Sequence, residues 1–477
     1  MPLFLYNTLS KSKEEFALPR YTRAVRMYNC GPTVYDTSHI GNLRSYVFAD
    51  IVHRALEYNG FSVKQVINIT DFGHLSSDAD NGQDKMSTAL KREGLELTLE
   101  NMRVLADRYI EEFYRDLKQL NIDTDRIQFP RASDHIAGEI AMIRTLEEKS
   151  YTYAGKEGVY FDTSRFPEYG KLGDIDIAGL REGARVAAAE DKKRPTDFLL
   201  WKKDEKMGWD SPWGKGFPGW HIECSAMVNA ALGKQIDIHT GGIDLMPTHH
   251  NNEIAQSESA TGKRPFSRFW LHHEFLNIND EKIAKSVGNV INLPTLIEKG
   301  YHPLSLRYLF LGAHYRSPLN FTWEALDAAQ TSFLKLRRFV DAEKNEGKPP
   351  AEWQNKIHKR LNDDLDTAGA LALVWEMSKE KTLSGAAIKA TVLDADRVFG
   401  LGLAEPDERA DTLCQKMFGI PVELSELPER VQTIVQAREA ARKEKKWEQA
   451  DSLRKDLQKM NYIIEDTSAG PQLFKKE

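Results

Sequence analysis

Cysteine is scarce in this sequence: three occur among 477 residues, at Cys30, Cys224 and Cys414. So few thiols exclude a disulfide framework and are typical of the reducing cytoplasm. Long apolar runs are missing too, since no stretch approaches the roughly 18 residues that a membrane-spanning helix needs. The first ten residues, MPLFLYNTLS, lack the basic start and the apolar centre of a secretory signal. We therefore expect a cytoplasmic protein without a membrane partner.

A large excess of charge of either sign is missing as well. The formal net charge is −6, with 29% charged and 41% hydrophobic residues, which is typical of a globular enzyme. A nucleic-acid partner would therefore be bound by local basic patches rather than by the field of the whole molecule. A length of 477 residues exceeds what one hydrophobic core supports, and it predicts two to four domains.

The most informative stretch, residues 219–258, contains three side chains that can bind a metal: Cys224, His249 and Glu253. Cys30 lies far upstream, in the turn NCGPT. A thiolate, an imidazole and a carboxylate suit zinc better than a hard cation such as magnesium. His249 and Glu253 are four residues apart, so they share one face if the segment is helical. Other histidines nearby remain alternatives to His249, namely His221, His239 and His250.

The first part of the chain has the pattern of a β-α-β unit. Residues 22–30 are predicted to form a strand, and residues 61–71, which are rich in β-branched side chains, a second one. The run between them repeats apolar residues with helical spacing, with Ser38 as its expected cap and Gly60 as its end. Further strands are predicted at DFLLWK, IDIHTGG and FWLHHEFL, and a helix ending at Gly262 between the last two. This alternation predicts a parallel sheet.

Two short motifs indicate phosphate chemistry. HIGN, at 39–42, opens the first predicted helix, where the small Gly41 lets a triphosphate approach the positive helix end. Lys282 and Lys285, in EKIAKS, can neutralise the charge that develops on a leaving pyrophosphate. A second candidate, KMSTA at 85–89, lacks the second lysine and lies in a polar stretch, so we discount it.

Together these motifs resemble those of the class I aminoacyl-tRNA synthetases, and more closely those of the cysteinyl-tRNA synthetase family. The first family signature ends in HIGH, where this chain has HIGN, and the second is KMSKS, where it has KIAKS. CGPTVYD, GWHIECSAM, GGIDL and HHNNEIAQ are similar to further segments of that family. The similarity runs from about residue 22 to 325 and continues in NDDLDTAGAL at 362–371.

The resemblance implies roles for particular residues. It implies a single zinc ion bound by Cys30, Cys224, His249 and Glu253. The implied contacts to the substrate cysteine are Thr70, Trp220 and His221. The implied catalytic residues are His39, Asn42, Lys282 and Lys285. The implied contacts to ATP, which would bind with Mg²⁺, are His39, Gly41, Asn42, Gly241, Gly242, Asp244 and Lys285.

The chain departs from the family pattern at both signatures. Asn42 replaces a histidine that contacts ATP in the family, although asparagine can still donate a hydrogen bond. Ile283 and Ala284 replace methionine and serine, while both lysines of the second signature remain. ATP binding is therefore expected to survive with altered affinity.

The expected architecture is α/β. A Rossmann-like parallel-sheet catalytic domain covers residues 1–325, with halves at about 22–71 and 196–290, an insertion at about 72–195 and a stem-contact region at 291–325. A helical bundle is expected at 326–403, beyond which residues 404–477 form a small anticodon-binding domain. The linker EKNEGKPP, at 343–350, is expected to isolate the C-terminal residues from the catalytic domain.

The last domain contains basic residues around an aromatic one, which suits unpaired bases. A solvated amphipathic helix has the same composition, so the assignment rests on the resemblance. The expected tRNA contacts are Arg442, Lys446, Trp447 and Asp451.

The resulting hypothesis is a cysteine–tRNA ligase that acts on L-cysteine, ATP and tRNA(Cys), as a monomer. One alternative is a ligase that joins cysteine to an amino-sugar, which would not need the roughly 145 residues beyond 330. Another is a non-catalytic RNA-binding paralogue, which would have no reason to keep four zinc ligands and both lysines.

Overall fold

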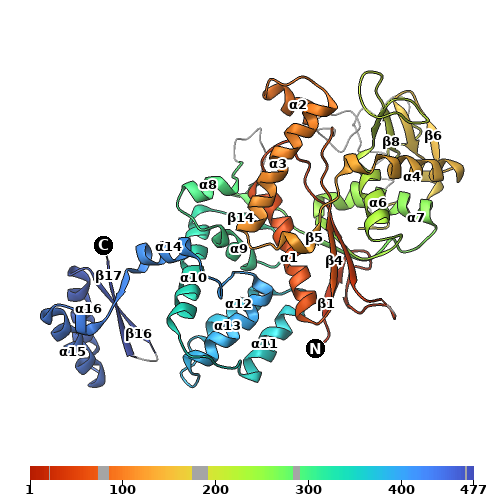
Figure 1. Ribbon diagram of the computed structural model, residues 1–477. Helices are drawn as coiled ribbons and strands as arrows, with labels where there is room; N and C mark the ends of the chain where they lie inside the picture. The colour runs from red at the N-terminus through yellow and green to blue at the C-terminus, as the bar shows by residue number, and fades with distance from the viewer. Residues whose placement is uncertain (21, 74–84, 174–191, 283–289, 468–469, 477) are drawn as a thin grey trace.

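The computed structural model describes residues 1–20, 22–73, 85–173, 192–282, 290–467 and 470–476. Figure 1 shows a parallel sheet with its covering helices and an insertion at the upper right, a group of helices below them, and a small unit at the left that carries the C-terminus. No described helix is both long and apolar enough to cross a membrane.

The centre is a five-stranded sheet in the order β11-β10-β3-β4-β5, in which every pairing is parallel. Its strands are β3 (Val25–Asn29), β4 (Val63–Ile67), β5 (Ile127–Gln128), β10 (Ile236–Gly242) and β11 (Ser267–His273). All residues of β10 are buried, as expected for a parallel strand that is covered on both faces. The predicted α/β class is therefore confirmed.

Helix α1 (Ile40–Tyr58) forms the predicted crossover from β3 to β4. Its cap is His39 rather than the predicted Ser38, because Nδ1 of His39 accepts a hydrogen bond from the backbone N–H of Asn42. Gly60 follows the helix end with a φ of 83°, a left-handed conformation that favours glycine.

The insertion combines helices with an antiparallel sheet. The helices are α2 (Lys85–Arg92), α3 (Leu99–Gln119) and α4 (Ile136–Glu148), and the strands are β6 (Thr152–Ala154), β7 (Gly158–Phe161), β8 (Phe198–Lys203) and β9 (Gly216–Pro218). The strand predicted at DFLLWK is β8, but it pairs antiparallel with β7, so the start of the second half at 196 was wrong. An apolar run is compatible with a parallel or an antiparallel sheet, so the sequence did not reveal the partner of this strand. In the structure Phe198 of β8 stacks on Phe161 of β7, with ring centroids 5.0 Å apart. Conversely, β5 joins the parallel sheet from within the predicted insertion.

The second half of the sheet domain adds the elements that carry the metal-binding motifs. These are α6 (Trp220–Ala231), the short turns η4 (Ile243–Leu245) and η5 (Met246–His250), and α7 (Asn251–Thr261). Helix α7 ends at Gly262, which has a φ of 69°, as the sequence predicted. Short segments complete the domain: β1 (Phe4–Asn7), β2 (Ser12–Glu15), β12 (Leu276–Ile278), β13 (Glu281–Lys282), β14 (Leu319–Phe321), η1 (Thr124–Arg126), η2 (Ala132–Asp134) and η3 (Thr163–Arg165).

Helices make up the region beyond residue 290. They are α8 (Leu293–Glu298), α9 (Pro303–Leu311), α10 (Trp323–Ala342), α11 (Ala351–Leu361), α12 (Thr367–Met377), α13 (Gly385–Phe399) and α14 (Glu408–Phe418). The expectation that the linker isolates the C-terminal residues was wrong, because α13 packs on α1 and Tyr58 donates a 2.6 Å hydrogen bond to Asp394. A polar linker indicates a break between helices, but it does not show whether the next helices dock.

The C-terminal unit has a hydrophobic cluster of its own. It contains β15 (Ile420–Val422), η7 (Leu424–Glu426), α15 (Glu429–Lys443), α16 (Trp447–Lys459), β16 (Tyr462–Thr467) and β17 (Gly470–Lys475). Val431, Val435, Leu457 and Leu473 are among the buried members of the cluster. Arg338 of α10 joins this unit to the helices, since it pairs with Glu465 and lies over the rings of Phe418 and Phe474.

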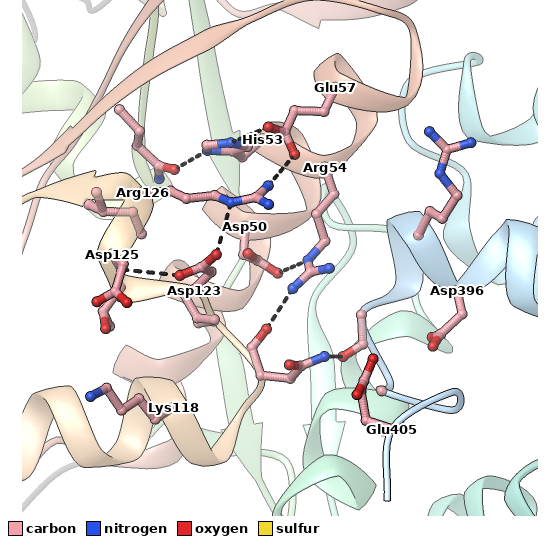
Figure 2. A pocket seen from close by; sticks show the side chains of 18 of the residues that line it. Asp50, His53, Arg54, Glu57, Lys118, Asp123, Asp125, Arg126, Asp396 and Glu405 are labelled. Atoms are coloured by element: carbon pink, nitrogen blue, oxygen red, sulfur yellow. Dashed lines mark hydrogen bonds and ion pairs between the residues drawn. The ribbon is translucent and has the colours of Figure 1, made fainter.

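A buried ion pair joins the sheet domain to the helices. The side chain of Arg307, in α9, is fully buried and pairs with Asp50 of α1, and it also donates hydrogen bonds to the carbonyls of Leu120 and Phe399. Burial alone would raise the pKa of Asp50, but Arg307 and Arg54 hold it below its ordinary value. A pocket of about 550 Å³ at this junction is lined by Asp50, Arg54 and Asp123, among others. Figure 2 shows these three side chains.

We expect Asp50→Asn to destabilise the protein strongly, because it leaves the buried Arg307 guanidinium without its counter-ion. Breaking such a pair by removing one partner costs roughly 3–5 kcal/mol of unfolding free energy. The control is Glu57→Gln, which breaks the exposed pair with Arg126 seen in Figure 2 and should cost below about 1 kcal/mol. Urea unfolding followed by circular dichroism measures both, and equal midpoints for the two variants would contradict the assigned role of the pair.

Candidate functional site

The four predicted metal ligands meet at the carboxyl edge of the parallel sheet, where ligands bind in open α/β sheets. Cys30 directly follows β3, Cys224 lies in α6, His249 in the π-helical turn η5 and Glu253 in the first turn of α7. Their ligand atoms all lie within 4.8 Å of one another. The expected shared helical face of His249 and Glu253 is confirmed, since Nε2 and Oε1 are 3.0 Å apart.

A second set of four shares two of these residues. Cys30, His239, His250 and Glu253 also bring their ligand atoms within 4.8 Å. Nε2 of His239 lies 3.0 Å from Oε2 of Glu253, and Nε2 of His250 lies 3.4 Å from Sγ of Cys30. His239 and His250, which the sequence left as alternatives to His249, are therefore within reach of a metal ion.

Burial and the neighbouring ligand residues shift the pKa values of the groups in this cluster. A hydrogen bond from Cys30 lowers the pKa of Cys224 to about 6, whereas burial raises the pKa of Cys30 well above its ordinary value. Burial opposes the ionised forms of His249 and Glu253. Glu253 and Cys224 nevertheless raise the pKa of His249 to about 10, and His239 and His249 lower the pKa of Glu253 to about 2. The shifted groups are a thiol, an imidazole and a carboxyl group that a metal ion could bind, and binding through the imidazole would require it to release its proton.

The expected cysteine-binding residues lie around this cluster. The Trp220 ring is 4.5 Å from the His249 ring, and Nδ1 of His221 is 2.9 Å from Nδ1 of His249. The hydroxyl of Thr70 donates a 3.0 Å hydrogen bond to Glu223, one residue before Cys224. All three residues therefore reach the cluster directly or through one neighbour.

Two buried acids here were not singled out from the sequence. Glu139, in α4, and Glu223, in α6, are both 0% exposed, and burial raises the pKa of each well above its ordinary value. Neither carboxylate oxygen of Glu139 has a hydrogen-bond partner among the described residues. The sequence did contain a signal for Glu139, because this acid interrupts the apolar helical stripe formed by Ile136, Ile143 and Leu146.

The predicted nucleotide residues lie at the same edge of the sheet. His39 and Asn42 cap α1 reciprocally, because Oδ1 of Asn42 also accepts from the backbone N–H of His39. Ser45, in the next turn of α1, lies 2.7 Å from Nε2 of His273 at the end of β11. His273 is paired in register with Gly242, so the opening of α1 and the glycine turn are neighbours.

The glycine turn is tightly packed. A Cβ added at Gly241 would lie 2.7 Å from Cε1 of His250, and one added at Gly242 would lie 2.3 Å from Oδ1 of Asp244. The exposed side chain of Asp244 follows in η4. Lys282 ends the described part of this region in β13, and Lys285 lies outside the described residues.

The expected tRNA residues lie in the C-terminal unit, apart from the metal cluster. Trp447 opens α16 with 58% of its surface exposed. Asp451, one turn further on, is also exposed. Arg442 pairs with Asp466, and Lys446 pairs with Glu444 at 2.7 Å, so both cations lie in exposed ion pairs.

Two family models match the chain. The catalytic-domain model of class I (C) tRNA synthetases matches residues 17–331, and the model of the cysteinyl-tRNA ligase anticodon binding domain matches residues 424–472. Cysteine–tRNA ligase 1 of Burkholderia lata is 45% identical over 99% of this chain and 97% of its own length. Cysteine–tRNA ligase of Treponema denticola is 40% identical over 100% of both chains. This chain belongs to the cysteine–tRNA ligase family.

The similarity of this chain to solved structures concerns the fold alone. Methionyl-tRNA synthetase of Mycobacterium tuberculosis, solved with methionyl-adenylate, superposes with a TM-score of 0.57 at 15% identity. The superposition covers 82% of this chain and 93% of that one. The predicted class I synthetase fold is thus confirmed, and the chain is a class I aminoacyl-tRNA synthetase by its family.

We expect Cys224→Ser to lose bound metal, because a hydroxyl replaces the thiolate whose pKa the site holds low. Elemental analysis of purified protein should give about one zinc per wild-type chain and a large loss in the variant. Cys414→Ser is the matched control, since that thiol lies outside both ligand sets. A full complement of zinc in Cys224→Ser would contradict the assignment of this ligand.

Proposed function

We propose that this chain acts as a cysteine–tRNA ligase through the site described above. It activates L-cysteine with ATP to cysteinyl-adenylate and pyrophosphate, and then transfers cysteine to the 3′ adenosine of tRNA(Cys). The observation that carries this proposal is the convergence of Cys30, Cys224, His249 and Glu253 at the sheet edge, in a chain related to cysteine–tRNA ligases over its whole length.

The donor set supports zinc as the metal. Two cysteines, a histidine and a glutamate within 4.8 Å are ligands that zinc prefers, whereas magnesium prefers oxygen atoms alone. Zinc, when bound, supplies a Lewis acid that prefers the thiolate of cysteine to the hydroxyl of serine. Trp220 and His221 would shape the pocket beside it, and Thr70 would contact the substrate ammonium.

Positioning accounts for most of the activation step. The amino end of α1, capped by His39 and Asn42, presents backbone N–H groups toward the triphosphate, which binds with Mg²⁺. Gly41, Gly242 and Asp244 would complete the ATP contacts, with Gly241 keeping the turn tight. Lys282 and Lys285 would stabilise the charge on the departing pyrophosphate.

The tail is proposed to read the tRNA. Trp447 offers an exposed ring to an unpaired base, and Arg442, Lys446 and Asp451 lie within one helical turn or loop of it. The domains would be a catalytic domain at 1–325, a helical bundle at 326–403 and an anticodon-binding domain at 404–477, in a cytoplasmic monomer. The amino-sugar ligase alternative does not account for residues 424–472, which match an anticodon-binding model.

The overall proposal is tested by ATP–pyrophosphate exchange with cysteine and with serine. We expect exchange with cysteine to exceed exchange with serine by roughly four decades, a selectivity that a site can reach without editing when it binds a group that the competitor lacks. Comparable exchange with both amino acids would contradict the selectivity, and no exchange with cysteine would contradict the activity.

We expect Lys285→Ala to slow adenylate formation by two or more decades, because one preorganised charge is worth roughly 3 kcal/mol in the transition state. Zinc content should not change. Lys85→Ala, in the discounted KMSTA segment, is the control and should leave the exchange rate near that of the wild type. The reverse pattern would move the catalytic assignment from Lys285 to Lys85.

We expect Trp447→Ala to raise the KM for tRNA while leaving cysteine-dependent exchange unchanged. Loss of one stacking platform costs roughly 1–3 kcal/mol, and the lost contact positions the RNA without taking part in the chemistry. Removal of residues 420–477 should act in the same direction and more strongly. A truncated enzyme that charges tRNA as well as the full chain would favour the amino-sugar alternative.

A further inference from the structure

A pocket of about 340 Å³ adjoins the proposed cysteine site, and none of the residues assigned above to cysteine, ATP or tRNA lines it. Its floor is Asp71, the residue directly after Thr70, together with Phe72. The first turns of α3 form one wall and Trp209, from the connection between β8 and β9, forms another. Its volume lies at the lower end of the roughly 300–1,000 Å³ of small-ligand sites.

The Trp209 ring is a partly exposed platform that its neighbours hold in place. It meets Phe72 edge-on with ring centroids 4.9 Å apart and Phe217 edge-on at 5.6 Å. Its backbone exchanges two hydrogen bonds with Gly216 in β9, which fix the loop. A rigid indole that keeps part of its surface accessible can stack on a nucleobase.

Asp71, at the floor of the pocket, is a hydrogen-bond acceptor whose orientation is fixed by its neighbours. Asp71 is 3% exposed and its carboxylate accepts hydrogen bonds from both the backbone N–H and the hydroxyl of Ser133, at 2.9 and 2.6 Å. Each carboxylate oxygen has a further lone pair, so Asp71 can accept from an exocyclic amino group. Arg103 lies at the rim with its side chain 59% exposed, in a loose 3.9 Å pair with Asp134, where it can reach a phosphate.

We infer that this pocket holds an unpaired cytosine of the tRNA acceptor end while the terminal adenosine receives cysteine. A tRNA ends in the single-stranded sequence CCA, and the pocket begins one residue from Thr70, which is proposed to contact the substrate ammonium, so a base next to the terminal adenosine can reach it. Asp71 accepts from the N4 amino group, as aspartate does in other cytosine contacts, Trp209 stacks on the ring and Arg103 pairs with the phosphate. The inference rests on the proposed function and extends it to the transfer step.

Single-turnover transfer from enzyme-bound adenylate tests the pocket, after cysteine-dependent exchange has been measured for every variant. Trp209→Ala should transfer cysteine roughly five- to hundredfold more slowly, with exchange within about twofold of the wild type. Trp209→Phe keeps an aromatic face and should recover most of the rate. Trp213→Ala, a tryptophan of the same insertion that does not line the pocket, is the matched control and should transfer at the wild-type rate.

A tRNA with an abasic site in place of the penultimate cytosine identifies the occupant. The wild-type enzyme should lose transfer rate on this substrate, and Trp209→Ala should lose nothing further, because base and ring form one contact. Three results would each overturn the inference. They are a wild-type transfer rate in Trp209→Ala, a further loss of transfer rate when this variant acts on the abasic tRNA, and a fall in exchange equal to the fall in transfer. If instead the wild-type enzyme shows no cysteine-dependent exchange, that result contradicts the proposed function and not the assignment of the pocket.

Discussion

The pairing of the buried Glu253 with two histidines at the carboxyl edge of the sheet is the constraint on which the site depends. Glu253 is 0% exposed, and an isolated carboxylate so deeply buried would be strongly destabilised. Contacts of 3.0 Å to His239 and His249 instead hold its pKa near 2. Removing either histidine takes away one of the two contacts to this carboxylate. These groups come from β10, η5 and α7, so the site is assembled from three segments that meet at the edge of the sheet.

Helix α1 connects this edge to the rest of the molecule. Its first turn presents the capped amino end and contacts His273 through Ser45, while its later turns carry Asp50 into the buried pair with Arg307. Arg307 in turn holds the ends of α3 and α13 through their carbonyls. One helix therefore spans from this edge of the sheet to the helical region, so a shift of the helices against the sheet would move the residues at 39–42.

Sequence patterns predicted elements and motifs better than they predicted pairing. The strands at 25–29, 63–67, 236–242 and 267–273 and the helix ending at Gly262 are where periodicity and turn residues placed them. The four metal ligands also came together as expected, because each belongs to a motif that ends a strand or begins a helix. The partners of β8 and the two-residue strand β5 were missed, since an apolar run does not reveal its neighbour and two residues have no periodicity.

The packing of the helices and of the C-terminal unit could not be predicted from the sequence for the same reason. The basic composition of the final helices indicated RNA contacts, with a solvated helix as the alternative. Arg438 is instead 2% exposed and both ends of its guanidinium bond Asp466, so it supports the fold of the unit. Arg338 contacts both Phe418 and Phe474 and so links the unit to α10. The tail has a hydrophobic cluster of its own, while the catalytic half keeps its geometry through the buried pair of Asp50 and Arg307. This division suits an enzyme whose chemistry requires fixed atoms at one end and whose RNA partner must be accommodated at the other.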